Sequence, residues 1–522
     1  MVNQTNLIDE KNIRLEKLNR IKELGINPYP ENYLDRIKTS EAITIANDIN
    51  LRDSEDIKKE FKNCIKLAGR LMAFRSHGKL SFGQIQDLDG RMQVAFVKGI
   101  SKVKDLKEND EIDSYKFIEK ILDIGDYIGV EGELFKTHHG EVTLFVKELT
   151  FLGKCLNPMP EKFHGITDEE VILRQRYLET LTEKEARDRF ILRSNIIKNI
   201  REFMWSNDFL EFETPILETK ATGAAAKPYF THNNALDIDL VLRISQELPL
   251  KKIIIGGFER IFEIGKAFRN EGIDPSHLPE HTHFEWYVAY WSYKENMDFV
   301  EKLIRNIFEK LEISPIIPVK DKDGNIADID FSKNWERLDF IELLKRDIGI
   351  DISKTKTKEE LLLLIKKNKI EMDGTANMSY ATLIDYLYKK MSRPKIKGPT
   401  FLYNYPKILQ PLARVNDKDK NMVDQFQLVI NGWEIAKGYS ELVDPVDQKQ
   451  RFIEQEKAIK NGDEEAMQGD DDYIQAMEYG MPPISGVGLG IDRLITMICK
   501  KDNLRDCVFF PLMKPKTKDE NF

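Results

Sequence analysis

The sequence predicts an α+β protein with two folded parts, a small antiparallel β-barrel and a larger domain of strands and long helices. A length of 522 residues, at about 150 residues per domain, suggests roughly three units. From about residue 63 to 153, short alternating apolar runs are separated by turn signals, as in a small barrel. From about residue 181, strands such as KKIIIGG alternate with helices such as FILRSNIIKNIREFMW.

The composition is that of a folded protein without a membrane segment. Apolar residues make up 41% and charged residues 32%, which is too apolar for a disordered chain. No run reaches the roughly 18 apolar residues that cross a bilayer. The start, MVNQTNLIDE, is polar and acidic, unlike a signal peptide. We therefore expect a cytoplasmic protein with no membrane partner.

Charge and cysteine content exclude further classes. The net charge of −9 argues against a surface coated with basic residues for non-specific nucleic-acid binding. Locally, residues 63–100 hold six basic residues against two acidic ones, which is a weak nucleic-acid signal. The four cysteines are far apart and form no Cys-x-x-Cys pair, so we expect reduced thiols.

The chain divides into four predicted segments. Residues 1–58 are a helical extension, in which residues 9–24 place apolar side chains at helical spacing. Residues 59–153 are the barrel, whose five strands are typical of the OB-fold, a fold that stacks nucleic-acid bases on aromatic side chains. Residues 154–180 are a linker. Residues 181–522 form the large domain, with a Lys-rich helical insertion at about 320–400.

Three segments of the large domain carry the chemistry. The first, FILRSNIIKNIREFMWSNDFLEFETPIL, is a long helix and then a strand that ends at Pro215. The second, GFERIFEIGKAFRNEGIDPSHLPEHTHFEWY, is a strand with Arg269 and Glu271 and then a loop with His277. The third, GVGLGIDRLITMI, places glycines ahead of Arg493 where a strand meets a helix. Arginine suits a phosphate ligand because its planar fork stays charged and binds in a bidentate manner.

Together these segments resemble the three signature motifs of class II aminoacyl-tRNA synthetases, and the surrounding sequence is similar to the lysyl-tRNA synthetases. Similar stretches include TGAAAKPYFTHNNALDIDLVLRIS, EIAKGYSELVDP, EYGMPPISGVGLGIDRL and, near the amino terminus, AGRLMAFRSHGKLSFGQIQDLDGRMQV. The resemblance runs from about residue 60 to 515 and is weakest at 320–400. It implies an OB-fold anticodon-binding domain followed by a class II catalytic domain, built on an antiparallel sheet flanked by helices.

The resemblance implies an ATP-dependent, AMP-forming lysine–tRNA ligase. Such an enzyme activates L-lysine with ATP to lysyl-adenylate and pyrophosphate, then transfers lysine to the 3′ end of tRNA(Lys). ATP must be held for in-line attack at its α-phosphorus, which is mostly positioning and charge neutralisation. The matching positions imply that Arg269 grips the α-phosphate and the substrate carboxylate, and that Arg493 grips the γ-phosphate.

Other matching positions imply contacts with ATP and with Mg²⁺. The further ATP contacts are Glu271, His277, His281 and Gly490; His281 stands where the family has a phenylalanine that packs on adenine. Glu434 matches the principal Mg²⁺ ligand, an oxygen donor of the kind this hard cation prefers. The family usually has a second glutamate where this chain has Gln427, whose amide oxygen can ligate without charge. A second metal is therefore either weaker here or held through water.

The lysine pocket requires carboxylates, because burying a substrate ammonium is costly unless charges and hydrogen bonds replace its water. The resemblance implies that Glu247 and Glu441, with Tyr287, take the ε-ammonium. It implies that Glu285 and the backbone of Gly223 take the α-ammonium.

Two more positions complete this pocket. By resemblance, Tyr439 lines it as well. Lys437 stands where the family commonly has asparagine, near the substrate carboxylate. Lys437 either pairs with that carboxylate, which we favour, or forms an ion pair with a glutamate of the pocket and so weakens lysine binding.

The barrel is expected to supply tRNA identity. By resemblance, Phe82 stacks on an anticodon base, Gln93 and Arg75 bond to its edges or phosphates, and Glu141 reads a second base. Stacking tolerates any base, so discrimination comes from the polar contacts. The alternative for Phe82 is a core residue of the barrel.

The resemblance also implies a homodimer, because the first motif with Pro215 resembles the family's two-fold interface. The N-terminal helix at 9–24 either packs on its own protein, which we favour, or contacts the tRNA.

Two alternatives remain beside the ligase. One is a paralogue that attaches lysine to a protein or makes dinucleotide signals, which the intact barrel argues against. The other is a tRNA-binding module with a decayed active site, which the joint presence of Arg269, Glu271, Glu434 and Arg493 argues against. If aspartate or asparagine, and not lysine, drove ATP–pyrophosphate exchange, the protein would instead be a related enzyme specific for that amino acid.

Overall fold

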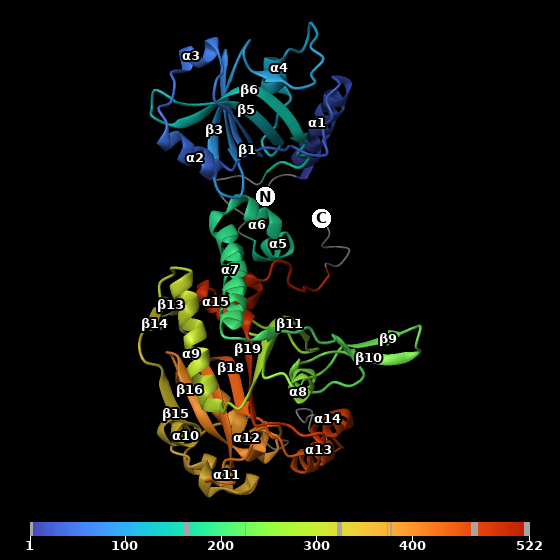
Figure 1. The fold of residues 1–522 in the computed structure, drawn as a ribbon, viewed down its shortest axis with the longest axis vertical. Coiled ribbons are helices and arrows are strands. Elements are labelled where there is room, and N and C mark those ends of the chain that lie inside the picture. Colours follow the sequence, from blue (N-terminus) through green and yellow to red (C-terminus); the bar gives the residue numbers. More distant parts are fainter. Residues whose placement is uncertain are drawn as a thin grey trace. The chain divides into compact units, whose positions relative to one another are not determined.

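The computed structural model consists of two compact units, residues 1–164 and 165–522, which are described separately (Figure 1). The structure describes residues 4–159, 168–224, 226–320, 326–372, 374–375, 378–460 and 468–515. Residues 160–167 of the predicted linker therefore lie outside the described residues. The remainder of that linker contains two short helices, α5 (Glu169–Arg174) and α6 (Arg176–Thr182).

The first unit is a closed β-barrel, which confirms the OB-fold. Its strands are β1 (Cys64–His77), β2 (Leu80–Gln86), β3 (Arg91–Val97), β4 (Lys102–Val103), β5 (Tyr127–Lys136) and β6 (Val142–Gly153). They pair in the order β3-β2-β1-β5-β6-β4, and an additional pairing of β3 with β6 closes the barrel. The two-residue β4, which the alternating pattern is too short to reveal, pairs with β6 in parallel.

The described residues of this unit also form the helices α1 (Gln4–Glu23), α2 (Thr39–Asp48), α3 (Ser54–Lys59) and α4 (Ser114–Lys120). The predicted N-terminal helix is α1, and it packs on its own protein. Ile21 and the following Leu24 are buried in the same apolar cluster as the barrel strands. The Nη1 atom of Arg14 donates to the carbonyls of Ile124 and Cys155, at 3.0 Å each.

The second unit is built on a sheet in the order β15-β16-β17-β18-β19-β12-β11-β7. These strands are β15 (Glu336–Asp339), β16 (Thr400–Pro406), β17 (Met422–Ile430), β18 (Trp433–Ser440), β19 (Ile484–Gly490), β12 (Glu280–Ala289), β11 (Arg260–Phe268) and β7 (Leu210–Glu211). Pairing is antiparallel throughout the centre and parallel only at the two edges, β15 with β16 and β7 with β11. This confirms the predicted antiparallel sheet.

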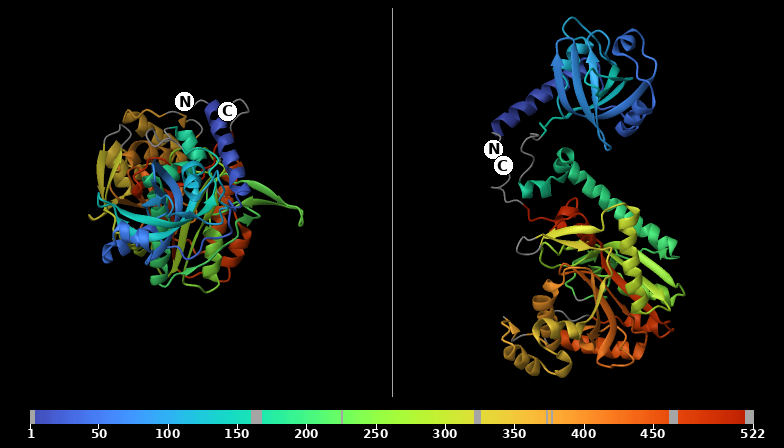
Figure 2. Two further views of the ribbon diagram at one scale, coloured as in Figure 1. Left: turned by 90° about the horizontal axis from the view of Figure 1, so that it is seen from above. Right: turned by 90° about the vertical axis from the view of Figure 1, so that its left-hand side faces the viewer.

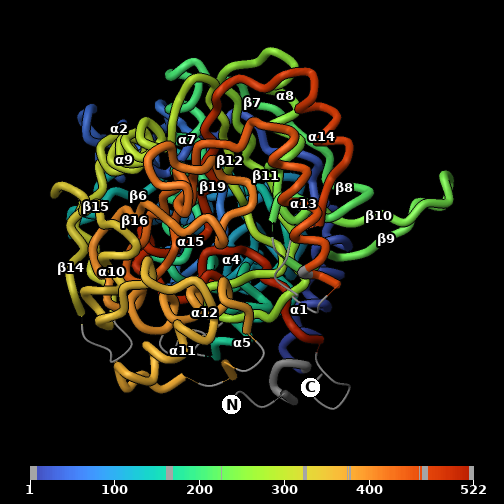
Figure 3. The backbone as a smooth tube through the Cα atoms, turned by 90° about the horizontal axis from the view of Figure 1, so that it is seen from below, coloured from blue at the N-terminus to red at the C-terminus, as the bar shows by residue number. Residues whose placement is uncertain are grey.

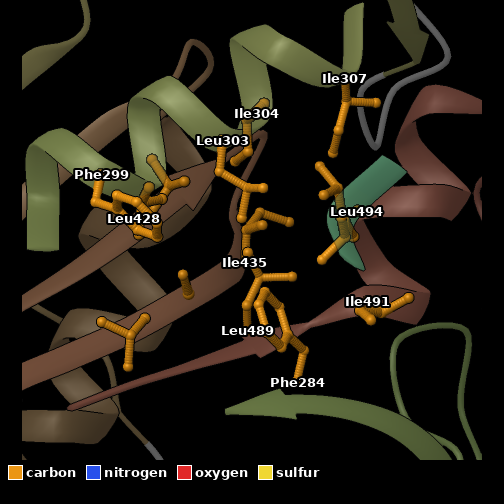
Figure 4. Close-up of a cluster of buried hydrophobic side chains, with 14 of the residues drawn as sticks. Phe284, Phe299, Leu303, Ile304, Ile307, Leu428, Ile435, Leu489, Ile491 and Leu494 are labelled. Atoms are coloured by element: carbon orange, nitrogen blue, oxygen red, sulfur yellow. The ribbon is translucent and has the colours of Figure 1, made fainter. Parts of the chain in front are cut away.

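Helices cover one face of this sheet and bury its apolar side chains. They are α7 (Lys184–Ser206), α9 (Tyr293–Lys310) and α15 (Ile491–Ile498). Leu303 of α9 points toward Ile435 and Leu489 of the strands, and Ile307 points toward Leu494 of α15 (Figure 4). The α9 helix starts with a complete capping box, in which Ser292 and Glu295 satisfy each other's backbone N–H groups. The opposite face of the sheet is left for the candidate site.

The predicted insertion at 320–400 is helical only in part. Its start forms β14 (Ile326–Asp330), which pairs with β13 (Ile316–Lys320), and then β15 of the main sheet. The expectation of helix is wrong there, because a four-residue strand at the edge of the sheet, exposed or half-buried along its length, has no periodicity that can be read. The helices α10 (Phe340–Ile348), α11 (Lys358–Lys367) and α12 (Tyr380–Leu387) follow and share one apolar cluster.

Further elements border the site. They are α8 (Glu247–Ile255), α13 (Pro445–Lys460), α14 (Asp471–Met477) and a small sheet of β8 (Leu217–Glu218), β10 (Ile238–Leu242) and β9 (Phe230–Asn233). The β9–β10 hairpin extends away from the other elements of its unit (Figures 2 and 3). Short helical turns lie at Ile352–Lys354, Tyr388–Ser392, Arg393–Lys395, Lys407–Leu409 and Leu504–Cys507. Within the described ranges, no helix is both long and apolar enough to cross a membrane.

Candidate active site

A cavity of about 510 Å³ lies in the second unit, and it brings together every site residue that the sequence predicts for that unit. The cavity is lined by strands β12, β18 and β19, by the start of α8 and by the loop between β11 and β12. The predicted residues along its wall are Gly223, Glu247, Arg269, Glu271, His277, His281, Glu285, Tyr287, Gln427, Glu434, Lys437, Tyr439, Glu441, Gly490 and Arg493.

Glu285 lies buried at one end of the cavity, on β12. Its Oε1 accepts from Ser245 Oγ at 2.7 Å and from the backbone N–H of Gln246 at 3.1 Å, and it lies 3.0 Å from His283 Nδ1. Its Oε2 accepts from Tyr287 Oη at 2.9 Å. Burial raises the pKa of this carboxyl, but the donors, His283 first, lower it to about 2. Glu285 is therefore a fixed negative charge.

Glu247 and Glu441 form a second acidic group beside it. The ammonium of Lys251 lies 2.5 Å from Glu247 Oε1 and 2.5 Å from Glu441 Oε2. Tyr439 Oη donates to the same Glu247 oxygen at 2.6 Å. Burial raises the pKa of Glu441 well above its ordinary value, while Lys251 acts in the opposite direction. The predicted carboxylates are thus present, together with an internal cation that the sequence did not reveal.

Two glycines make room for this acidic end. Gly223 has a φ of +83°, a region that glycine adopts readily, and an added Cβ there would lie 3.2 Å from the Cβ atoms of Glu247 and Ser245. At Gly486 of β19, an added Cβ would overlap the ring of Tyr287 and lie 2.5 Å from Glu441 Oε1. At Gly490 an added Cβ meets only Arg493, at 3.7 Å or more. The tight backbone approach is therefore at Gly486.

Cationic groups line another part of the cavity. Arg269 donates from Nε to the carbonyl of Ile244 at 3.4 Å, and among the described residues no group bonds to its two Nη atoms. Lys437 lies on β18, in register between Gln427 and Gly488, and within the described structure its ammonium has no ion pair. Both charges are available to an anionic ligand.

Arg493 is held by the backbone and by His277. Its Nη1 donates to the carbonyl of Glu434 at 2.8 Å, and its Nη2 lies 3.2 Å from His277 Nε2. His277 Nδ1 lies 2.8 Å from Asp274 Oδ2. Since a carboxylate accepts only, the Nδ1 of His277 carries the proton and its Nε2 accepts from Arg493. Asp274 and His277 thus orient the guanidinium.

His281 lies on β12 beside these cations. Burial and the charges of Arg269, His283 and Arg493 lower the pKa of His281 to about 2. The ring of His281 lies 5.8 Å from that of His283, at 66° to it. His281 is therefore a neutral aromatic ring, which can stack on a base. Glu271 is exposed nearby, and the structure assigns no side-chain partner to it among the described residues.

The two predicted metal ligands differ in their surroundings. The carboxylate of Glu434 has no described ion-pair partner and lines the cavity. The Oε1 of Gln427 accepts from Tyr405 Oη at 2.8 Å and from Tyr388 Oη at 3.3 Å. Both lone pairs of that oxygen are therefore used, and Gln427 fits a metal less well than Glu434 does. Across the described residues, no group of three or more His, Cys, Asp or Glu side chains could hold a metal by itself.

The predicted anticodon residues share one surface of the barrel. Arg75 on β1 pairs directly with Phe82 on β2, and Phe82 pairs with Ala95, two residues beyond Gln93 on β3. Gln93 Nε2 donates to Glu141 Oε2. Phe82 is half-buried and packs at the edge of a small apolar cluster, so part of its side chain remains exposed.

Sequence reasoning missed several residues of the cavity. Ser245 and His283 bond to Glu285, and Lys251 bonds to Glu247 and Glu441. Lys251 could have been found, because it stands four residues after Glu247 on one helix. Tyr405, to which no role was assigned, donates to Gln427. Such contacts between distant strands leave no local signal.

Comparison with known proteins agrees with this geometry. The family model for tRNA synthetases class II (D, K and N) matches residues 168–514, and the model for the OB-fold nucleic acid binding domain matches residues 65–152. A lysine–tRNA ligase of Carboxydothermus hydrogenoformans is 39% identical over 97% of this chain and 98% of its own length. The lysine–tRNA ligase of Thermosipho africanus is 40% identical over 98% of this chain and 97% of its own length. That of Thermoanaerobacter pseudethanolicus is 41% identical over 97% of this chain and 96% of its own length. The chain belongs to the class II tRNA synthetase family of the D, K and N type.

Proposed function

We propose that the protein is a lysine–tRNA ligase, which forms lysyl-adenylate from L-lysine and ATP and then charges tRNA(Lys). The observation that carries this proposal is the acidic end of the cavity, where Glu247, Glu285 and Glu441 converge. An aspartate or asparagine side chain would meet only negative charge there. A lysine side chain brings the ammonium that such a site needs.

The cationic part of the cavity suits ATP. Arg269 binds the α-phosphate and the substrate carboxylate with its two Nη atoms, which have no partner among the described residues, and Arg493 binds the γ-phosphate. His277 orients Arg493 through Nε2, at 3.2 Å. The neutral ring of His281 stacks on the adenine, and Glu271 and Gly490 border the nucleotide. Lys437 pairs with the lysine carboxylate, since the described structure offers its ammonium no carboxylate partner.

The substrate lysine is held by its α-ammonium, its carboxylate and its side-chain ammonium. Glu247, Glu441 and Tyr287 bind the ε-ammonium, with Tyr439 as a further wall. Glu285 and the backbone of Gly223 bind the α-ammonium.

Magnesium is the expected cofactor, and Glu434 is the residue that fits it. When bound, Mg²⁺ neutralises charge on the phosphates of ATP. Glu434 contributes the charged ligand, with an unpaired carboxylate in the cavity. We assign no ligand role to Gln427 beyond its bonds to Tyr405 and Tyr388.

The reaction follows from these positions. The lysine carboxylate is ionised at neutral pH, so it attacks the α-phosphorus without a general base. The bond from that phosphorus to the bridging oxygen breaks, and pyrophosphate leaves. A terminal ribose hydroxyl of the tRNA then attacks the lysyl carbonyl carbon. AMP leaves, and its phosphate oxygen takes the hydroxyl proton.

The barrel binds the anticodon through the surface of Arg75, Phe82, Gln93 and Glu141. Phe82 stacks on one base, while Gln93 and Arg75 contact its edge and the backbone. Glu141 accepts a hydrogen bond from a second base. An enzyme that charges tRNA acts where translation takes place, so we place the protein in the cytoplasm.

A homodimer is proposed from the apolar side chains that stay exposed around the first motif. Trp205 at the end of α7 is 53% exposed, and Leu210 and Leu217 are exposed on the strands that follow. These residues flank Pro215. Sedimentation at micromolar concentration should give twice the chain mass for the wild type and the chain mass for Trp205→Glu. A monomeric wild type would refute the dimer.

Pyrophosphate exchange with each standard amino acid tests the function directly. We expect exchange with lysine alone, in the wild type and in Lys437→Asn, followed by charging of tRNA(Lys). Exchange with aspartate or asparagine would refute the lysine assignment. Exchange without charging would support the protein-modifying alternative, and no exchange would support the decayed module.

A further inference from the structure

Lys251 is a fully buried cation behind the acidic end of the cavity. It lies on α8, one turn after Glu247, and only 1% of its side chain is exposed. Its Nζ lies 2.5 Å from Glu247 Oε1 and 2.5 Å from Glu441 Oε2, so one ammonium bridges two carboxylates that come from α8 and from the end of β18. Glu247 and Glu441 line the cavity, whereas Lys251 does not. The bridge therefore stands behind the surface that a ligand meets.

Aromatic rings close the remaining sides of this ammonium. The Nζ of Lys251 lies 5.5 Å from the ring centre of Tyr439, and 5.9 Å from those of Tyr287 and Tyr473. Each ring presents a negative face to the cation. The buried ammonium is thus in contact with two carboxylates and close to three aromatic rings. Such a charge stays in place, because leaving it buried without its carboxylate partners is strongly unfavourable.

The carboxylates divide their oxygens between Lys251 and the cavity. Glu247 uses Oε1 for Lys251 and Tyr439, and among the described residues its Oε2 has no partner. Glu441 uses Oε2 for Lys251, and its Oε1 lies on the cavity side, beside Gly486. Each carboxylate thus offers one oxygen to a ligand ammonium while the other is held from behind.

The formal charges of this end match a diamino acid. In their ionised forms, Glu247, Glu285 and Glu441 contribute three negative charges, and Lys251 contributes one positive charge. The difference is two negative charges, which equals the two ammonium groups of a lysine substrate. Without Lys251 the site would hold one unbalanced carboxylate in a buried position.

We infer that Lys251 is a positioning residue for substrate selection: it fixes Glu247 and Glu441 and opposes the burial that favours the protonated form of Glu441, so that the pocket demands one side-chain ammonium. This inference rests on the proposed lysine activity. Lys251 touches neither substrate nor reacting atoms in this arrangement. It acts through the two carboxylates.

Removing this cation should make lysine recognition dependent on pH. Two like charges at close range cannot both ionise in a buried site, so one carboxyl would take up a proton. Among the described residues, the groups facing this pair are Glu285, Tyr287 and His283 on β12, Tyr439 on β18, Tyr473 on α14 and Lys251 on α8. Burial and the carboxylates raise the pKa values of the three tyrosines, so these stay neutral. The Nδ1 atom of His283 already lies 3.0 Å from Glu285 Oε1. No other lysine or arginine among these groups replaces Lys251.

The test compares Lys251→Met with Lys252→Met, a matched control on the same helix. Lys252 points to Asp470 at 3.6 Å and lies outside the cavity lining. Pyrophosphate exchange is measured from pH 6 to 8.5, with lysine and with norleucine, which lacks the ε-ammonium. For Lys251→Met we expect a lysine KM at least tenfold higher at pH 6, falling as the pH rises and the carboxyl ionises. Selectivity for lysine over norleucine should fall by a similar factor, with the ATP KM within twofold. The wild type and Lys252→Met should keep a flat profile.

Results that would overturn the role of Lys251 can be distinguished from a result that would refute the proposed function. A folded Lys251→Met variant with wild-type lysine KM and a flat profile would overturn the role of Lys251. Equal rises in the KM for lysine and for ATP would also overturn it, since they indicate a general structural role. If the Met variant does not fold, Lys251→Arg keeps the charge and must retain the flat profile and the norleucine selectivity; loss of either overturns the inference. A wild type without lysine-dependent exchange would instead refute the proposed function.

Discussion

The crowding at Gly486 gives the sharpest prediction about the lysine pocket. Gly486 lies on β19, opposite Tyr287 of β12 and Tyr439 of β18. An added Cβ would overlap the Tyr287 ring and lie 2.5 Å from Glu441 Oε1, so Gly486→Ala must displace both side chains. Gly488, two residues along the same strand, would place its Cβ 3.2 Å from the ring of His283. Gly398 has nothing within 4 Å.

Overpacking of this kind costs about 1–3 kcal/mol. At about 1.4 kcal/mol per tenfold change, this corresponds to an increase of about 5- to 150-fold in the lysine KM for Gly486→Ala. The ATP KM should change little, because Arg269 and Arg493 do not contact Tyr287 or Glu441. Gly488→Ala should give a smaller effect on lysine, and Gly398→Ala none.

Pyrophosphate exchange with lysine or ATP as the varied substrate provides the measurement, and thermal unfolding of each variant provides the control for folding. A Gly486→Ala variant that folds and binds lysine like the wild type would refute the assignment of this pocket. So would a rise in the ATP KM equal to that for lysine.

Three further predictions concern other parts of the molecule. Phe82→Ala should raise the tRNA KM by the loss of one stacked base, about 1–3 kcal/mol, in charging assays, while lysine-dependent exchange is unchanged; an unchanged tRNA KM would make Phe82 a barrel core residue. Glu434→Gln should raise the Mg²⁺ concentration needed for half-maximal exchange, and an unchanged requirement would remove Glu434 as a ligand. The folded pKa of His281, about 2, lies below its unfolded value near 6.5, so stability falls as the pH drops below 6.5. His281→Phe should therefore lose less stability on acidification, by up to about 1.4 kcal/mol per pH unit in denaturant titrations, and an identical loss would contradict a neutral His281.

Local patterns were sufficient for most of the fold. The barrel strands alternate apolar and polar side chains, and Asp89-Gly90, one of the turn signals of this segment, separates β2 from β3. The insertion was harder to interpret, because β14 and β15 are short and lie between helices. What makes β15 a strand is its pairing with β16, which lies some sixty residues further along the chain. Such long-range pairing has no local signature.

The candidate site divides in the same way. Arg269, Glu271 and Arg493 stand in segments whose order and spacing are informative, and the structure places all three in one cavity. Gln427 was predicted from its position alone, and its two tyrosine partners come from β16 and from the turn at Tyr388. The position of a residue in the sequence indicates which of its atoms face a ligand only when its neighbours in the folded structure are known. The bonds of Gln427 therefore required the structure.

The distribution of charge in the cavity gives a physical reason for the orientation in which we expect lysine to bind. Among the described residues, Arg269, Arg493 and Lys437 are unpaired or held only by neutral groups, so under the proposed function we expect them to attract the phosphates and the lysine carboxylate. We expect the three carboxylates, one of them fixed with a pKa of about 2, to attract the two ammonium groups. Lysine, whose carboxylate and ε-ammonium are separated by its aliphatic side chain, satisfies both regions only in one orientation. That orientation directs its carboxylate toward the phosphates, so selection of the amino acid and alignment for attack arise from the same charges.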